Sequence, residues 1–92
     1  MTEDRYELIV APSARRQLSE QLPEPVAVAA FEFIVGPLLD NPQRVGKRLR
    51  PSLEDRYSAR RGTYRVLYRI DQQLRHVTVV GVFARAAAYR TH

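Results

Sequence analysis

The spacing of apolar and polar residues predicts one short strand, two helices and then a run of further strands. Residues 6–10 form a β-branched and aromatic run that is typical of a strand. Ser13 stands where an N-cap belongs, so we expect a helix over residues 14–22 that Pro23 and Pro25 stop. The chain therefore begins with a strand that leads directly into a helix.

A second helix is predicted over residues 26–40, where apolar residues recur at helical spacing. It carries one charge inside, Glu32, and a helix this apolar must be buried, most simply against a sheet. The pair Gly36-Pro37 is a point at which the helix can bend, because a proline ring removes a backbone donor. Asn41-Pro42 closes the helix.

The second half of the chain predicts a basic loop and three strands joined by tight turns. We expect the loop over residues 43–55 and the strands over Arg56–Arg61, residues 64–70 and His76–Ala84. In the middle strand, alternation makes one face apolar and the other charged. The apolar face carries Tyr64, Val66, Tyr68 and Ile70, and the other face carries Arg65, Leu67 and Arg69.

This order of elements predicts an α+β fold in which two helices pack on one face of a four-stranded antiparallel sheet. The first strand would pair with one of the later three, since alone it would be an unpaired apolar edge. The length of 92 residues fits a single domain, which we place over residues 1–92.

The composition removes several classes of site. The chain has no cysteine, which excludes disulfides, thiolate zinc sites and a cysteine nucleophile. No apolar stretch approaches the roughly 18 residues that a spanning helix needs, and the acidic N-terminus is unlike a secretory signal. We therefore expect a cytosolic protein without a membrane partner. Glycine-rich phosphate loops and histidine pairs at metal spacing are also missing, so we expect no cofactor and no metal.

The charge is divided unevenly between the two halves. Residues 1–43 hold three basic and seven acidic residues, a net charge of −4, whereas residues 44–92 hold twelve basic and three acidic residues, a net charge of +9. All the basic residues except Lys47 are arginine, whose planar guanidinium suits phosphate. A genome rich in G and C would also favour arginine codons. The asymmetry points to nucleic acid, an anionic membrane surface or an acidic protein partner.

Without a metal, a nuclease of this composition would act on RNA, because the ribose 2′-OH can attack the neighbouring phosphate. Such a reaction needs a group that accepts the 2′-OH proton, cations that stabilise the phosphorane and a donor for the leaving oxygen. Arginine supplies the cations but is a poor base. The residues left for proton transfer are Lys47, Tyr57, Tyr64, Tyr68, Tyr89, His76 and His92.

The densest constellation is the predicted hairpin over residues 57–70. It aligns Ser58, Arg60, Arg65 and Arg69 along adjacent strands, and four or five cations on one concave sheet face would bind a phosphate backbone. The other interpretation is a solvated sheet face on which arginine stems cover apolar neighbours.

The hairpin, together with the basic Gly46-Lys47-Arg48-Leu49-Arg50, the apolar helix over residues 31–39 and the final Arg85-Ala86-Ala87-Ala88-Tyr89-Arg90, resembles the RelE toxins of type II toxin-antitoxin modules. The resemblance runs over residues 6–90 and is greatest for the actinobacterial RelE branch. The pattern aromatic-Ser-x-Arg-x-Gly-x-Tyr-Arg-x-x-Tyr-x-Ile is specific for the wider RelE/ParE superfamily. The resemblance implies the microbial-ribonuclease-like RelE fold and a toxin that cuts messenger RNA in the ribosomal A site.

The resemblance also assigns roles to individual residues. Arg65 matches the arginine that contacts the scissile phosphate, and Arg85 matches a second phosphate-stabilising arginine. Tyr89 matches a C-terminal tyrosine near the substrate base or leaving group, and Arg60 falls where a sheet lysine of the family lies. Lys47 is the candidate general base by elimination. Further RNA-binding candidates are Arg48, Arg50, Ser58, Arg61 and Arg69.

The chain departs from the family at the positions that bear on proton transfer. Ser58 stands where some RelE toxins carry a lysine base, Lys47 where the YoeB branch has a carboxylate, and Ala87 where YoeB has a histidine. Two other hypotheses for the function therefore stay open. One is a non-catalytic inhibitor of DNA gyrase of the ParE kind, and the other is a toxin whose catalysis is weakened.

The resemblance implies a RelB-like antitoxin as partner. An acidic, partly disordered antitoxin tail could neutralise the basic half and fold as it binds. The toxin-antitoxin complex would reach operator DNA through the antitoxin.

Overall fold

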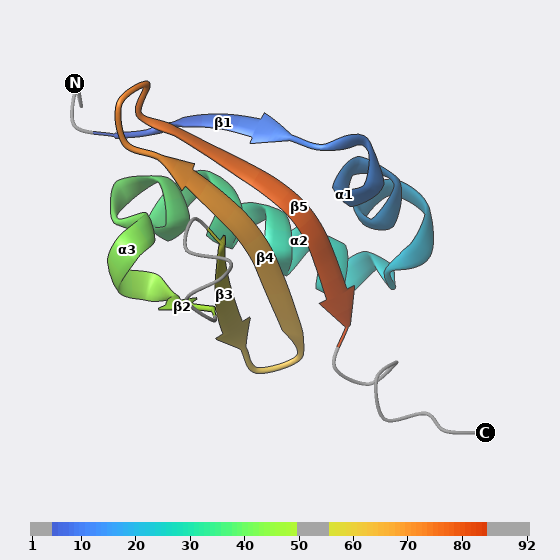
Figure 1. Ribbon diagram of the computed structural model, residues 1–92. Coiled ribbons are helices and arrows are strands. Elements are labelled where there is room, and N and C mark those ends of the chain that lie inside the picture. Colours follow the sequence, from blue (N-terminus) through green and yellow to red (C-terminus); the bar gives the residue numbers. More distant parts are fainter. Residues whose placement is uncertain (1–4, 50–55, 85–92) are drawn as a thin grey trace.

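The computed structural model describes residues 5–49 and 56–84, which form one mixed sheet with helices packed on one of its faces (Figure 1). The strand order is β1-β5-β4-β3-β2. The strands are β1 (Glu7–Val10), β2 (Lys47–Arg48), β3 (Arg56–Arg61), β4 (Tyr64–Asp71) and β5 (His76–Ala84). The helices are α1 (Pro12–Arg16) with a π-helical turn over Gln17–Gln21, α2 (Glu24–Phe33) with a π-helical turn over Ile34–Leu38, and α3 (Pro42–Val45).

The α+β class is confirmed, but the prediction of four antiparallel strands is wrong in two details. Strand β1 pairs parallel to β5, and such a pairing needs a long connection between the two strands instead of a tight turn. The fifth strand, β2, lies in the stretch predicted as a loop and pairs with β3 through Lys47 and Arg48. A two-residue strand has no alternation to read, so the sequence pattern could not reveal it.

The first helix starts two residues earlier than predicted, and Ser13 does not cap it. The N-cap is Ala11, and Pro12 at the first helical position has no N–H to satisfy. The Ser13 hydroxyl instead donates to the Val80 carbonyl at 2.8 Å, and the Val82 N–H donates to the Gln17 side-chain oxygen at 2.7 Å. Helix α1 and its π-helical turn therefore supply hydrogen-bond partners for backbone groups on the edge of β5, beyond the point where β1 ends.

The second helix changes its hydrogen bonding at the place where a bend was expected. Pro37 lies inside the π-helical turn and cannot donate a backbone hydrogen bond. The guanidinium of Arg5 donates to the carbonyls of Val35 and Gly36 and forms an ion pair with Asp40 at 2.7 Å. This contact joins the segment before β1 to the end of the helix.

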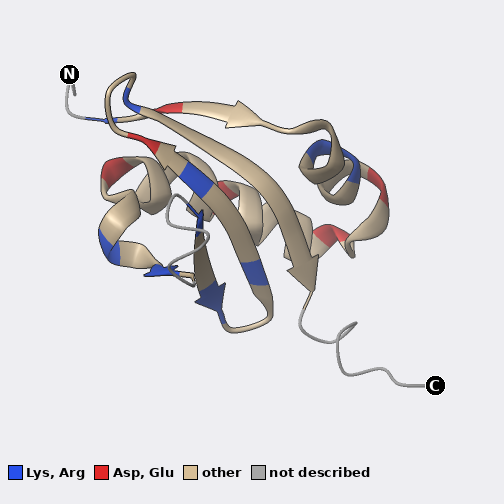
Figure 2. Cartoon of the chain, viewed as in Figure 1, with Lys and Arg blue, Asp and Glu red and all other residues tan. Residues whose placement is uncertain are grey.

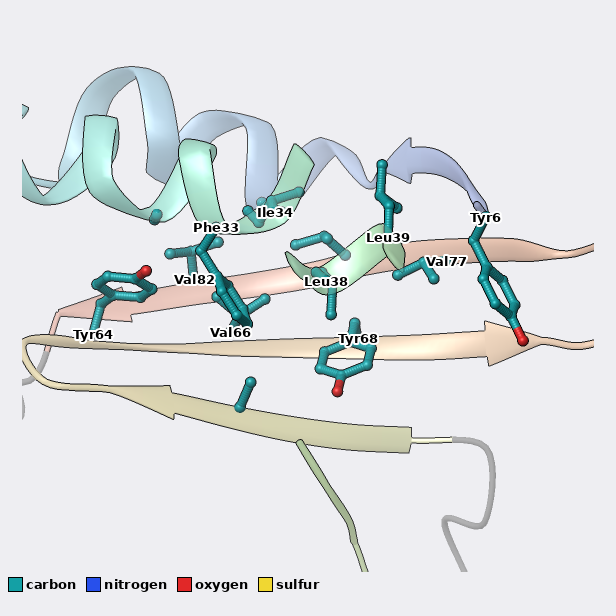
Figure 3. Packing of buried hydrophobic residues seen from close by; sticks show 14 of the residues in the cluster. Tyr6, Phe33, Ile34, Leu38, Leu39, Tyr64, Val66, Tyr68, Val77 and Val82 are labelled. Atoms are coloured by element: carbon teal, nitrogen blue, oxygen red, sulfur yellow. The ribbon is translucent and has the colours of Figure 1, made fainter. Parts of the chain in front are cut away.

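The predicted alternation of β4 is confirmed, and it places the core between the sheet and the second helix (Figure 3). Tyr68, Val66, Ile34 and Leu38 are each fully buried. Phe33 on α2 lies 6.4 Å, centroid to centroid, from the ring of Tyr64 on β4. The opposite side of the sheet, which we call the outer face, carries the exposed arginines of β4. Within the described residues, no helix is long and apolar enough to span a membrane.

Candidate functional site

The outer face of the β3–β4 hairpin carries two pairs of arginines that lie directly opposite each other. Arg60 pairs with Arg65, and Arg56 pairs with Arg69. Figure 2 shows basic positions along β3 and β4 and in β2. Like charges at directly opposite sheet positions repel each other. The ion pairs found within the described residues involve none of these four side chains, so an anion would relieve the repulsion.

The Arg60–Arg65 pair forms one wall of a groove of about 660 Å³. The other wall belongs to the segment that contains helix α3 and strand β2, residues 42–49, which we call the arm. The groove is lined by Arg44, Val45, Gly46, Lys47, Arg48, Leu49, Ser58, Arg60 and Arg65. Five of these nine residues are basic and none is acidic. A concave surface of one charge focuses the electrostatic potential and attracts anions.

The arm is held against the sheet by the helix-facing side of β4. The hydroxyl of the fully buried Tyr68 donates to the Pro42 carbonyl at 2.7 Å. Burial raises the pKa of Tyr68 above its ordinary value, so the hydroxyl stays a neutral donor at physiological pH. A side chain at Gly46 would overlap the Tyr68 hydroxyl and lie 2.9 Å from the Ser58 carbonyl. Only glycine therefore allows the arm to approach this closely.

Strand pairing with β3 also holds the arm, and a ring stack within the hairpin packs against Tyr68. Lys47 is in register with Ser58, and the Leu49 N–H donates to the Arg56 carbonyl at 2.9 Å. The ring of Tyr57 stacks on that of Tyr68, with centroids 5.6 Å apart and planes inclined by 18°. Contacts within the chain thus hold the arm against the sheet, which limits the ordering cost of binding.

The structure brings together five of the residues that the sequence singled out, namely Lys47, Arg48, Ser58, Arg60 and Arg65. Arg69 lies on the same outer face but outside the groove. Arg61 lies on the other face, where its guanidinium sits 4.5 Å from the centroid of the Phe33 ring. The predicted positions Arg50, Arg85 and Tyr89 lie outside the described residues.

Two basic residues at this surface were missed by the sequence reasoning. Arg56 opposes Arg69 on the outer face, and the alternation of Arg56, Ser58 and Arg60 along β3 could have revealed it. Arg44 lines the groove from α3. Its stretch was predicted as a loop, and no periodicity there would have placed it.

A model of the family described as the ParE toxin of the type II toxin-antitoxin system parDE matches residues 8–89. The chain belongs to this family of toxins. The toxin is 46% identical to Toxin RelE of Mycobacterium tuberculosis over 91 residues, which are 98% of this chain and 93% of the relative. It is also 46% identical to Toxin RelG of the same organism over 85 residues, 92% of this chain and 97% of the relative.

Solved structures agree with this membership. The crystal structure of the RelBE2 toxin-antitoxin complex from M. tuberculosis superposes with a TM-score of 0.83 at 44% identity, covering 88% of the toxin and 99% of that chain. The isolated RelE toxin of E. coli has a TM-score of 0.71 at 22% identity, covering 86% and 83%, and shows that the fold is shared. The predicted relationship to the actinobacterial RelE branch is confirmed, and the toxin is the RelE-like component of a type II module.

Proposed function

We propose that the toxin is a metal-independent endoribonuclease that cuts messenger RNA and so inhibits translation. The observation that carries this proposal is the groove whose described lining residues include five basic and no acidic side chains, and in which Arg60 and Arg65 lie in cross-strand register. The 2′-OH of the bound ribose attacks the adjacent phosphorus, and the 5′ oxygen of the next nucleotide leaves. The added negative charge of the transition state would develop beside these two arginines, which both line the groove.

Each candidate residue has a part in this reaction. Arg65 and Arg60 stabilise the phosphorane, and Lys47, in register with Ser58 on the neighbouring strand, accepts the 2′-OH proton. From the family resemblance, Arg85 adds a further charge and Tyr89 acts at the leaving group or the base. Because arginine does not give up its proton, Lys47 is the groove residue suited to the role of base.

RNA beyond the scissile phosphate would follow the basic surface. Arg48 and Ser58 line the groove, and Arg69 extends the same face toward the far end of β4. Arg50 follows the arm in sequence. Arg61 has no part in this surface, because it lies on the helix-facing side against Phe33.

The partner that we expect for the toxin is the antitoxin of the same toxin-antitoxin module. The related RelBE2 toxin was solved in complex with its antitoxin, and we expect a RelB-like antitoxin with an acidic tail to neutralise this toxin in the cytoplasm. Such a tail would compete with RNA for the basic groove. The ribosomal A site would present the messenger, and the complex would contact operator DNA through the antitoxin.

Toxin freed of its antitoxin should cleave messenger RNA on translating ribosomes, and Arg65→Ala should strongly reduce that cleavage. Cleavage products mapped on ribosome-bound and on free messenger would separate ribosome-dependent from independent activity. The family model that matches the chain is described for ParE, which makes gyrase poisoning the second candidate. Gyrase-linked DNA breaks without any RNA cleavage would overturn the ribonuclease proposal. The names of the two relatives at 46% identity, RelE and RelG, favour the ribonuclease over the gyrase poison.

A further inference from the structure

Phe83 is a large aromatic side chain on the outer face that the fold does not use. It is 45% exposed although it lies near the end of a central strand, and it is absent from the hydrophobic core. Its partner across the sheet is Arg65. Directly opposite positions in an antiparallel pair have Cβ atoms about 5 Å apart, so the ring stands beside the arginine that lines the basic groove.

The ring of Phe83 lies over Gly81 on the same face. A Cβ atom at Gly81 would be 2.8 Å and 2.9 Å from two ring carbons, so the absence of a side chain there makes room for the ring. Gly81 is itself buried although it faces outward. The aromatic contacts found in the described residues pair Phe33 with Tyr64 and Tyr57 with Tyr68, and the cation-π contacts use Phe33 and Tyr6.

We propose that Phe83 is a stacking platform for a nucleobase of the RNA whose phosphate occupies the groove. This inference rests on the proposed ribonuclease function. A flat aromatic surface beside a row of cations is the combination by which proteins hold single-stranded nucleic acid, with the cations on phosphates and the ring on a base. Arg65 and Phe83 stand side by side, so one nucleotide could meet both.

The platform gives the active surface something that arginine alone does not provide. Phosphate contacts fix the position of the backbone but do not orient the base. Stacking of a base on Phe83 would fix the rotation of the nucleotide next to the scissile phosphate and bring its ribose into line for attack. Because every base has an aromatic face, the platform orients RNA without strong sequence preference.

The first test uses the absence of tryptophan from the chain. Phe83→Trp creates a single tryptophan on the platform, and a base that stacks on it should quench its fluorescence. Single-stranded RNA should quench it, and the same RNA with abasic nucleotides should bind more weakly and leave the fluorescence unchanged. The matched control is Phe31→Trp, since Phe31 is 52% exposed on α2, away from the groove. Equal quenching in both variants would overturn the proposal.

The second test separates an aromatic ring from a merely apolar side chain. Phe83→Leu should weaken RNA binding or raise KM by about 5- to 150-fold, the range measured for loss of one stacked base, while Phe83→Tyr retains near wild-type values. A single abasic position in the substrate should make the wild type and Phe83→Leu equal, and should do so at one position only. Equal KM values for the two proteins on intact RNA would refute the platform.

The outcomes also distinguish this inference from the function on which it rests. If the wild-type toxin neither binds nor cleaves RNA, the ribonuclease proposal fails and the platform with it. If the wild type cleaves RNA and Phe83→Leu cleaves it equally well, only the platform fails. Gly81→Ala provides a further check, because its Cβ must displace the ring and should therefore weaken binding while Phe83 itself is retained.

Discussion

The two sides of the sheet differ more than any other two regions of the molecule. On the helix-facing side of β4, Tyr64, Val66 and Tyr68 are buried to 6% exposure or less. On the outer face, Arg65 and Arg69 are exposed, and they oppose two further arginines on β3. Neighbouring residues of β4 thus face opposite sides of the sheet, one side for the hydrophobic core and the other for binding. Changes on the outer face should alter activity without altering stability, and changes on the helix-facing side should do the reverse.

The largest effect is expected at Lys47 on the outer face. Lys47→Arg keeps the positive charge of the groove but removes a side chain that can accept a proton. If Lys47 is the general base, the rate of cleavage should fall by about 10²- to 10⁴-fold while RNA binding is retained. Single-turnover cleavage and equilibrium binding measure the two quantities separately. Full activity of Lys47→Arg would show that the lysine contributes only charge.

Arg65→Ala should lower cleavage by about 10²- to 10³-fold, as expected when one group that stabilises the transition state is lost. The free energy of unfolding should change by no more than about 0.5 kcal/mol, because Arg65 is exposed and its truncation to alanine removes no core contact. Arg16→Ala on α1 is the matched control, since it deletes an exposed arginine from a helix outside the groove. A large loss of stability in Arg65→Ala would contradict the expectation that outer-face residues affect activity and not stability.

The converse change is Val66→Ala, one residue further along β4 and fully buried. It removes two methyl groups and leaves a cavity, so the unfolding free energy should fall by about 2 kcal/mol. Cleavage measured well below the melting temperature should not change. Leu67→Ala removes more atoms from a half-buried site on the outer face and should nevertheless cost less stability. Denaturant unfolding of both variants measures the two losses of unfolding free energy, and a larger loss in Leu67→Ala would contradict this expectation.

This division was largely predictable in the strands, because alternation within a strand depends on local sequence. The turn at Gly62, with a φ of 54°, sets the register in which Arg60 meets Arg65. The arm was not predictable, since its place depends on tertiary contacts between residues far apart in sequence. Gly46 and Tyr68 show the reason: a missing side chain and a buried hydroxyl are complementary only in the folded protein.

Tyr68 is the residue at which the division between the two sides should fail. It belongs to the core, yet its hydroxyl holds the arm that carries Lys47. Tyr68→Phe should cost about 1 kcal/mol of stability and also reduce cleavage by about five- to tenfold, since a misplaced arm forfeits energy of the same order. Tyr64→Phe is the matched control, because the Tyr64 hydroxyl donates to Ala29 on α2 and not to the arm. Equal cleavage by both variants would refute a positioning role for Tyr68.

The smallest effect is the dependence of stability on alkaline pH. Burial raises the pKa of the Tyr68 hydroxyl in the folded toxin, whereas in the unfolded chain it ionises near pH 10.0. Below pH 10 both states are protonated and the stability is intact. Above pH 10 the unfolded chain loses its proton first, so the unfolding free energy should fall by up to about 1.4 kcal/mol per pH unit from this group. Tyr68→Phe should make the curve above pH 10 less steep, although Tyr64, whose pKa burial also raises, keeps part of the slope. The outer-face variant Arg65→Ala should leave the slope unchanged. A wild-type slope retained in Tyr68→Phe would mean that the hydroxyl is not held in the buried, protonated state on which the arm depends.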